Sequence, residues 1–302
     1  MRKILFLFGT RPEAIKLAPL ALCLKHLPTL YSVQICVTAQ HREMLDHALA
    51  AFGISPDFDL DLMTPGQSLF QSTSRIVAAL ERVLGDVKPD LAVVQGDTTT
   101  TFCGALAAFY SRVPVAHVEA GLRTGDLEQP FPEELNRTLT SHIAALNFAP
   151  TQSAADHLAR EAVPGQIMIT GNTGIDAVLH VRDRLESGEL AVSAPRFDRP
   201  GKRLVLVTAH RRESFGEGFE RICRAFLRIA DRGDVHLVYP VHLNPNVQGP
   251  VESHLRSHSN ITLTSPMDYV PFVDLMRRAH IILTDSGGIQ EEAPSLGKPV
   301  LV

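Results

Sequence analysis

Four carboxylates in the first half of the chain are placed to move protons. Asp97 and Glu119 each follow an apolar run, and Glu133 and Glu134 open a predicted helix. If the apolar runs are parallel strands, their carboxyl ends meet at one edge of a sheet, where open α/β proteins bind ligands. Carboxylates crowded at such an edge push their pKa values apart, so that one serves as acid and another as base. The pattern therefore indicates proton transfer.

Glu133 and Glu134 are adjacent but are given different roles. Glu134 and Arg137 stand three residues apart on the predicted helix, which favours an exposed ion pair of small energetic value. Glu133 starts the helix beside a glycine-rich turn. We therefore choose Asp97, Glu119 and Glu133 as the candidate acid and base residues.

Two basic residues near the amino terminus could meet an anionic ligand. Arg11 follows the first apolar run, and Lys16 lies one turn into the next helical segment. The alternative is a solvated charged loop.

The sequence argues against a dinucleotide site. The segment 9–13 lacks the G-x-G-x-x-G spacing, and no acidic residue stands at the end of the second apolar run, where a ligand of the ribose would be expected.

A second group of candidate residues lies near the carboxyl end. An apolar run leads into Asp285-Ser-Gly-Gly288, and Gly287 and Gly288 begin a helix, so Ser286 and the first backbone N–H groups suit a phosphate. Glu292, one turn further on, could accept hydrogen bonds from a ribose diol. Glycines also begin helices for packing reasons, which is the alternative.

Two histidines follow apolar runs in the second half. His210 could bond a diphosphate oxygen or protonate a leaving group, and His242 occupies a similar place with a weaker argument. A structural role is the alternative for both.

The sequence has no H-E-x-x-H or C-x-x-C pattern, so we expect no metal. Its four cysteines are expected to be reduced thiols.

Repeated apolar runs and helical segments would position these residues. Their alternation predicts parallel sheets covered on both faces, and hence an α/β protein of two Rossmann-like domains with a cleft between them. We place the first domain at 1–185, a linker rich in Pro, Gly and charge at 186–202, and the second domain at 203–302. The main predicted strands are 4–8, 33–38, 58–62, 91–94, 113–118, 146–149, 167–170, 204–208, 235–240, 261–264, 281–284 and 299–302.

Composition excludes several classes of protein. Of 302 residues, 45% are hydrophobic and 21% charged, as in a globular protein, and the net charge of -4 gives no reason to expect nucleic acid or an anionic membrane as partner. The first apolar run is too short for a signal peptide or a membrane span, so we expect a cytoplasmic protein. Because the chain stops inside its last apolar run, we interpret it as a truncated form, less stable and less active than a longer one.

Six motifs stand in order along the chain: Gly9-Thr-Arg-Pro-Glu-Ala-Ile-Lys16, Gln95-Gly-Asp-Thr98, His117-Val-Glu-Ala-Gly-Leu-Arg123, Pro130-Phe-Pro-Glu-Glu134, Thr208-Ala-His-Arg-Arg-Glu213 and Asp285-Ser-Gly-Gly-Ile-Gln-Glu-Glu292. Together they resemble the motifs of the non-hydrolysing bacterial UDP-N-acetylglucosamine 2-epimerases. The resemblance implies the GT-B fold and the reversible interconversion of UDP-GlcNAc and UDP-ManNAc. It also implies anti elimination of UDP through 2-acetamidoglucal, with re-addition, and no nicotinamide or other cofactor. The product would supply ManNAc for surface polysaccharide synthesis.

The same resemblance implies roles for individual residues and a homodimer. Asp97, Glu119 and Glu133 would be the acid and base residues, with His210 on the diphosphate. Phe272 matches a position beside the uracil, although a core role fits it nearly as well. Family chains continue beyond this point, with a further arginine contact to UDP and a terminal helix. The other implied positions are Arg11 and Lys16 for the substrate, Ser286, Gly287, Gly288 and Glu292 for UDP, and Gln40, Arg211 and His242 for a regulatory UDP-GlcNAc site.

Three other functions stay open. A hydrolysing relative would release ManNAc and UDP from the same cleft if water captured the intermediate. A GT-B glycosyltransferase would not need three clustered carboxylates. A truncated chain could also be an inactive UDP-sugar-binding module. The sugar products formed from UDP-GlcNAc would separate these functions.

Overall fold

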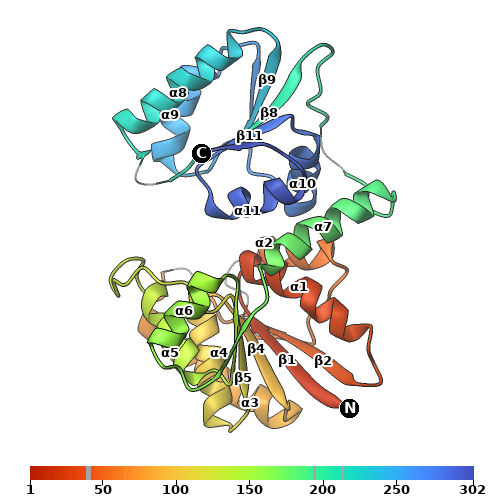
Figure 1. Ribbon diagram of the computed structural model, residues 1–302, viewed down its shortest axis with the longest axis vertical. Coiled ribbons are helices and arrows are strands. Elements are labelled where there is room, and N and C mark those ends of the chain that lie inside the picture. The colour runs from red at the N-terminus through yellow and green to blue at the C-terminus, as the bar shows by residue number, and fades with distance from the viewer. Residues whose placement is uncertain (39–41, 65, 193–194, 212–213) are drawn as a thin grey trace. The chain divides into compact units, whose positions relative to one another are not determined.

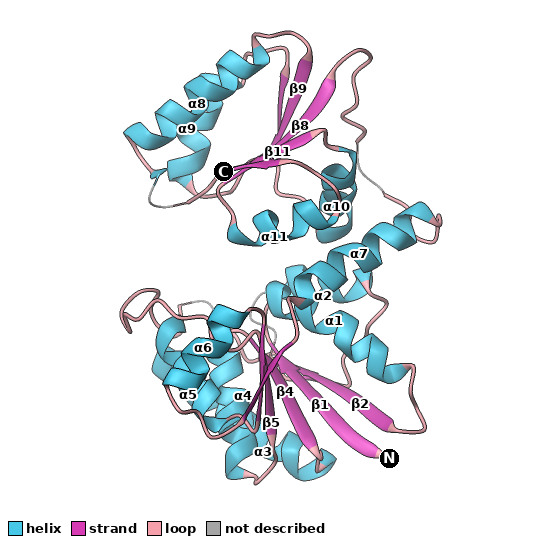
Figure 2. Ribbon diagram, in the orientation of Figure 1, coloured by secondary structure: helices cyan, strands magenta, loops and turns pink. Residues whose placement is uncertain are grey.

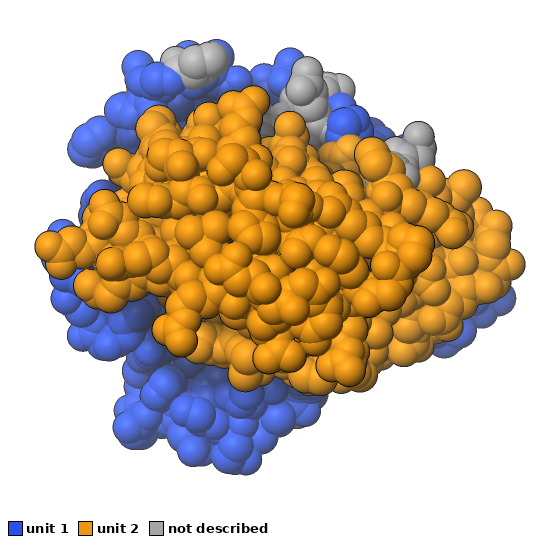
Figure 3. Space-filling view, turned by 90° about the horizontal axis from the view of Figure 1, so that it is seen from above, with its two compact units in different colours: residues 1–177 blue, residues 178–302 orange. Residues whose placement is uncertain are grey.

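The computed structural model describes residues 1–38, 42–64, 66–192, 195–211 and 214–302. The chain divides into two compact units, Met1–Ala177 and Val178–Val302, which are coloured separately in Figure 3. The division falls within helix α7 (Thr173–Glu186). The described residues of 187–202 form neither helix nor strand. The linker proposed for 186–202 stays a prediction.

The first unit is built on a parallel sheet of seven strands. Their order is β3-β2-β1-β4-β5-β6-β7 (Figure 1). The chain therefore adds strands on one side of β1 up to β3 and on its other side from β4 onward. The strands are β1 (Arg2–Phe8), β2 (Tyr31–Val37), β3 (Phe58–Asp59), β4 (Leu91–Gln95), β5 (Val115–Val118), β6 (Leu146–Ala149) and β7 (Gln166–Ile169). The helices that join them are α1 (Arg11–Lys25), α2 (Arg42–Ala51), α3 (Leu69–Val87), α4 (Thr99–Tyr110), α5 (Glu133–Ile143) and α6 (Gln152–Arg160).

The sheet of this unit is buried on both faces, as its continuous apolar strands require. Leu5 and Val94, on neighbouring strands, are fully buried. They pack in one core with Ile76 and Leu80, which are one turn apart on α3. Helix α4 starts at a polar cap, because the Thr98 side chain accepts the N–H of Thr101, whereas α5, which begins at Glu133, has no side-chain cap. The cap fixes the start of α4 directly after Asp97.

The second unit repeats this arrangement with five parallel strands, in the order β10-β9-β8-β11-β12. Here the strand order reverses between β8 and β11. Figure 2 shows that α8 with α9, and α10 with α11, cover the sheet. The strands are β8 (Arg203–Thr208), β9 (Val235–Pro240), β10 (Ile261–Thr264), β11 (Ile281–Thr284) and β12 (Val300–Leu301). The helices are α8 (Glu217–Ala230), α9 (Pro245–Leu255), α10 (Tyr269–Arg278) and α11 (Gly287–Ser295).

The α/β class predicted from the sequence is confirmed, with two corrections in detail. Helix α6 was missed because two of its three buried residues, Ala154 and Ala155, are small, so that Leu158 is the one large apolar side chain on its inward face. Strand β3 covers two residues, not the five predicted. No helix in the described segments is long and apolar enough to cross a membrane.

Candidate functional site

A cavity of about 560 Å³ opens at the carboxyl edge of the first sheet, where β1, β4 and β5 end. Three of the predicted acid and base residues line it, and so does Lys16, whereas Arg11 begins α1 without being among the lining residues. The charged residues that line the cavity are Glu13, Lys16, Asp97, Glu119, Glu133 and Arg137. The structure therefore gathers Asp97, Glu119 and Glu133, which are separated by up to 36 positions in sequence, at one place.

Glu119 is held in place by two side chains, Lys16 and Gln95. Lys16 Nζ lies 2.7 Å from Oε1 and 2.5 Å from Oε2, and the Gln95 side-chain amide also donates to Oε2. The backbone of Glu119 is in the left-handed region, with φ of 64°. A residue with a side chain is strained there, and such strain is common at functional sites. Glu119 is thus fixed in a costly conformation with both oxygens engaged.

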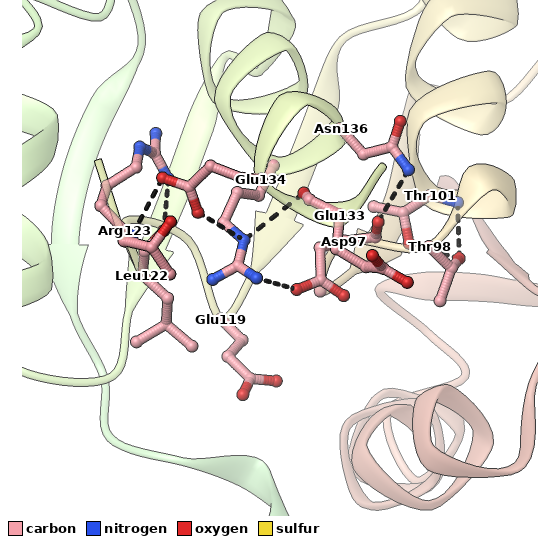
Figure 4. A network of polar contacts seen from close by, with 12 residues as sticks. Asp97, Thr98, Thr101, Glu119, Leu122, Arg123, Glu133, Glu134 and Asn136 are labelled. Carbon is pink, nitrogen blue, oxygen red and sulfur yellow. Dashed lines mark hydrogen bonds and ion pairs between the residues drawn. The ribbon is translucent and has the colours of Figure 1, made fainter. Parts of the chain in front are cut away.

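Asp97 is tied to helix α5 through both its side chain and its backbone. Arg137 Nη2 lies 2.8 Å from Oδ2, and Asn136 Nδ2 donates to the Asp97 carbonyl at 2.9 Å (Figure 4). Burial raises the pKa of Asp97 above its ordinary value; Arg137 acts against this rise, and the nearby Glu119 and Glu133 add to it. The carboxyl of Asp97 therefore binds a proton more readily than that of a solvent-exposed aspartate.

Glu134 does not form the exposed ion pair that its spacing from Arg137 suggested. Its side chain is buried, with 1% of the residue exposed. One carboxylate oxygen accepts the backbone N–H groups of Thr124 and Gly125 at 2.9 and 3.0 Å. The prediction was wrong because the glycine-rich loop folds back over the start of α5, and spacing on the helix alone does not reveal that cover.

Glu13 is a buried carboxyl that the sequence analysis did not select. It accepts the N–H groups of Gly9 and Thr10 at 3.1 and 2.7 Å, and it contacts the hydroxyls of Thr98 and Thr101 at 2.7 and 3.0 Å. Burial raises its pKa, against the effect of these hydrogen bonds. The T-x-x-E capping box at Thr10 could have identified it. Glu13 joins the ends of β1 and β4 beside the cavity.

His117 is a buried neutral histidine beneath the site. Burial lowers its pKa to about 4. Its Nε2 lies 2.7 Å from the carbonyl of Gly96, so that nitrogen carries the proton, and Nδ1 lies 3.3 Å from the Ser141 hydroxyl. His117 therefore connects the residue before Asp97 with helix α5, from a strand that ends just before Glu119.

The loop after Glu119 is fixed to the missed helix α6. Arg123 forms a bidentate ion pair with Glu161, with two nitrogen–oxygen distances of 2.8 Å, and His157 Nδ1 contacts the carbonyl of Gly121 at 2.9 Å. Arg123 is thereby directed to α6 and is not among the residues that line the cavity. Helix α6 holds the loop that joins two of the candidate acids.

In the second unit, Asp285 organises the carboxyl edge at the point where strand order reverses. Its Oδ2 accepts the backbone N–H groups of His210 and Arg211, both at 2.7 Å, and Arg211 Nε donates to its carbonyl at 2.9 Å. The rings of His210 and His242 stack, with centroids 5.3 Å apart. Burial lowers the pKa of His210, and Asp285 acts against that shift. Gln40, predicted to join Arg211 and His242, lies outside the described residues.

Helix α11 starts at the same edge with the predicted Ser-Gly-Gly sequence. The Ser286 side chain makes no capping hydrogen bond to the helix. A Cβ placed on Gly288 would lie 3.7 Å from Glu292 Oε1, so the Glu292 carboxylate reaches back toward the helix start. Phe272 is half-buried on α10. Within the described segments, no group of three His, Cys, Asp or Glu side chains is placed to hold a metal ion.

Comparison with known proteins gives consistent matches. The family model described as UDP-N-acetylglucosamine 2-epimerase matches residues 27–302. The chain is 57% identical to the UDP-N-acetylglucosamine 2-epimerase of Salmonella typhimurium over 307 residues, covering 99% of this chain and 81% of that protein. It is 51% identical to the enzyme of that name from Bacillus subtilis over 304 residues, covering 99% of this chain and 78% of that protein.

Solved structures agree with these matches. The UDP-GlcNAc 2-epimerase of Neisseria meningitidis bound to UDP-GlcNAc has a TM-score of 0.88 and 49% identity, covering 99% of this chain and 82% of that one. A more distant likeness, to the glycosyltransferase SnogD of Streptomyces nogalater at 15% identity and a TM-score of 0.57, concerns the fold alone. Together with the two parallel sheets, it confirms the GT-B class predicted from the sequence.

Proposed function

The chain belongs to the UDP-N-acetylglucosamine 2-epimerase family, and from this premise we propose that it interconverts UDP-GlcNAc and UDP-ManNAc reversibly without hydrolysis. The observation that best supports the proposal is the convergence of Asp97, Glu119 and Glu133 on one cavity that also contains Lys16 and Arg137. Inversion at C2 needs removal and return of a proton on opposite faces of the sugar. More than one carboxylate is therefore required.

We propose elimination and re-addition of UDP as the chemical route. The C2–H bond is not acidified by a carbonyl, so its deprotonation must be coupled to departure of UDP from C1. A carboxylate takes the C2 proton, the C1–O bond breaks, and the electron pair of C2–H forms the C1=C2 double bond of 2-acetamidoglucal. UDP then adds back to C1 as an acid returns a proton to the other face of C2.

Asp97, Glu119 and Glu133 share the acid and base roles in this proposal. The role of Glu119 is supported by the contacts of both its oxygens with Lys16 at the cavity. The role of Asp97 is supported by a pKa that burial raises, which suits a proton carrier. His210 would contact the diphosphate, and Arg11 and Lys16 the substrate.

The hydrolysing reaction and the inactive binding module are the two alternatives, and incubation with UDP-GlcNAc followed by NMR of the products separates them from epimerisation. We expect UDP-ManNAc to accumulate with UDP-GlcNAc at equilibrium. Free ManNAc and UDP as end products would indicate hydrolysis instead. Bound but unchanged UDP-GlcNAc would indicate a binding module.

We assign UDP binding to the second unit, through Ser286, Gly287, Gly288 and Glu292, with Phe272 beside the uracil. Replacing Glu292 by alanine is expected to weaken UDP binding by about 1–3 kcal/mol, because a charged acceptor of the ribose hydroxyls is lost. Isothermal titration calorimetry measures this directly. An exposed glutamate of the neighbouring position, Glu291, gives the matched control as Glu291→Ala. Unchanged UDP affinity in the Glu292 variant would refute the assignment.

We further propose a cytoplasmic homodimer whose product feeds surface polysaccharide synthesis. Two large apolar side chains are exposed together at the end of α4, Phe109 at 59% and Tyr110 at 69%, where a second copy would cover them. Cys23 and the buried cysteines are free thiols, as a reducing compartment maintains them. The regulatory UDP-GlcNAc site at Gln40, Arg211 and His242 stays a prediction.

A further inference from the structure

We propose that Glu134 is a positioning residue for the epimerisation, because its buried carboxylate holds the guanidinium of Arg137 against Asp97. The inference rests on the function proposed above and adds a residue to its machinery. It replaces the exposed ion pair expected from the sequence with a chain of three charged groups, in which Glu134 is buried and Arg137 and Asp97 are half-buried.

Glu134 is fixed from one side by the backbone. Its Oε1 accepts the N–H groups of Thr124 and Gly125 at 2.9 and 3.0 Å. Its Oε2 is buried and, within the described part of the chain, makes no hydrogen bond; the Nε of Arg137 lies 3.4 Å from it. A buried charge needs a partner of opposite sign. The second oxygen of Glu134 therefore depends on Arg137.

Arg137 faces both carboxylates with different nitrogens. Its Nε donates a hydrogen bond to the carbonyl of Glu133 at 3.4 Å and forms an ion pair with Glu134 Oε2 at the same distance, and its Nη2 lies 2.8 Å from Asp97 Oδ2. The side chain is only 12% exposed. Because a guanidinium is a rigid plane, holding Nε on Glu134 also sets the direction of Nη2. Glu134 thus determines where the cation meets Asp97.

The charges around Asp97 give that contact a chemical consequence. Two cations, Arg137 and Lys16, and two carboxylates, Glu119 and Glu133, act on Asp97. Lys16 Nζ is bound to both oxygens of Glu119, so Arg137 is the cation in direct contact with Asp97 among the described residues. Arg137 lowers the pKa of Asp97 against burial and the two carboxylates. If Glu134 no longer held Arg137, Asp97 would keep its proton to higher pH.

The test compares Glu134→Gln, on α5, with a matched control at a second residue that anchors the loop after Glu119, Glu161 at the end of α6. Glutamine keeps the volume and can still accept from Thr124 and Gly125, but its amide would turn N–H groups toward Arg137. Glu161→Gln breaks the Arg123–Glu161 pair, which anchors the same loop without contacting Asp97. Titration of ¹³C-labelled aspartate carboxyls by NMR reports Asp97 in each protein, with the resonance assigned by its loss in Asp97→Asn.

We expect the Asp97 resonance of Glu134→Gln to titrate at higher pH than in the wild type, and that of Glu161→Gln to be unmoved. The kcat of Glu134→Gln should fall by about 10–100-fold with little change in KM, as expected for a misplaced catalytic group. An unmoved Asp97 titration in Glu134→Gln would overturn the proposal, and so would an equal movement in Glu161→Gln.

A second variant covers the case in which Glu134→Gln does not fold. Arg137→Lys keeps the charge, but one ammonium cannot present two fixed nitrogens to Glu134 and Asp97. It should also raise the pH at which Asp97 titrates, and an unmoved titration would count against the proposal. The titration uses protein without substrate, so it decides the positioning role even if the wild-type chain fails to convert UDP-GlcNAc, which would overturn the proposed function alone.

Discussion

Turnover of UDP-GlcNAc by Asp97→Asn is expected to be about 10²–10⁴-fold slower than that of the wild type, the usual range for a lost general acid or base. The amide keeps the shape of the side chain but can neither take nor give the proton. UDP affinity should be nearly unchanged, because the proposed contacts to UDP lie in the second unit. NMR assays of initial rates give kcat, and calorimetry gives UDP affinity.

Asp126→Asn provides the control for this comparison. Asp126 is an exposed aspartate on the loop between Glu119 and Glu133 and is not among the residues lining the cavity. Asp126→Asn should turn over UDP-GlcNAc like the wild type. If Asp97→Asn retained full turnover, proton transfer would have to be assigned to the other carboxylates. If Asp97→Asn lost both turnover and UDP binding, Asp97 would be supporting the fold of the protein rather than proton transfer.

The largest effect on stability is expected from Gly121→Ala, with the free energy of unfolding lowered by about 2–6 kcal/mol. Gly121 has φ of 90°, a conformation that a side chain strains, and an added Cβ would lie 2.2 Å from the carbonyl oxygen of Ala154. That oxygen belongs to helix α6, so either the helix or the loop that follows Glu119 would have to move. Urea unfolding measures the loss.

Gly125→Ala separates the two causes. Gly125 lies in the same loop with φ of 80°, and an added Cβ would meet no atom within 4 Å. In Gly125→Ala the free energy of unfolding should fall only by the cost of backbone strain, about 1–2 kcal/mol. Equal losses in the two variants would show that contact with α6 is not what requires glycine at position 121.

The alternation of strands and helices could be predicted from the sequence because buried parallel strands appear as uninterrupted apolar runs. The placement of Asp97 and Glu119 followed from the same rule: each comes directly after such a run, and neighbouring parallel strands end at one edge. Helix α6 was missed because its inward face carries one large apolar side chain, Leu158, beside two alanines.

The polar contacts between distant segments could not be predicted. In a sequence, an exposed ion pair and a buried one both appear as an acid and an arginine three residues apart. Only the fold shows that the loop at 124–125 covers Glu134. The capping box at Thr10 was visible in the sequence, but the hydroxyls of Thr98 and Thr101 that Glu13 also contacts come from another helix. Such contacts depend on register and chain path, which residue types do not specify.

The most direct test of the proposed reaction is incubation of the chain with UDP-GlcNAc in heavy water, followed by NMR of the sugar at C2. Elimination and re-addition through Asp97, Glu119 and Glu133 exchange the C2 proton with solvent. We therefore expect deuterium at C2 of the UDP-ManNAc formed, and no deuterium in UDP-GlcNAc kept without protein. UDP-ManNAc that retains its original C2 proton would contradict the account.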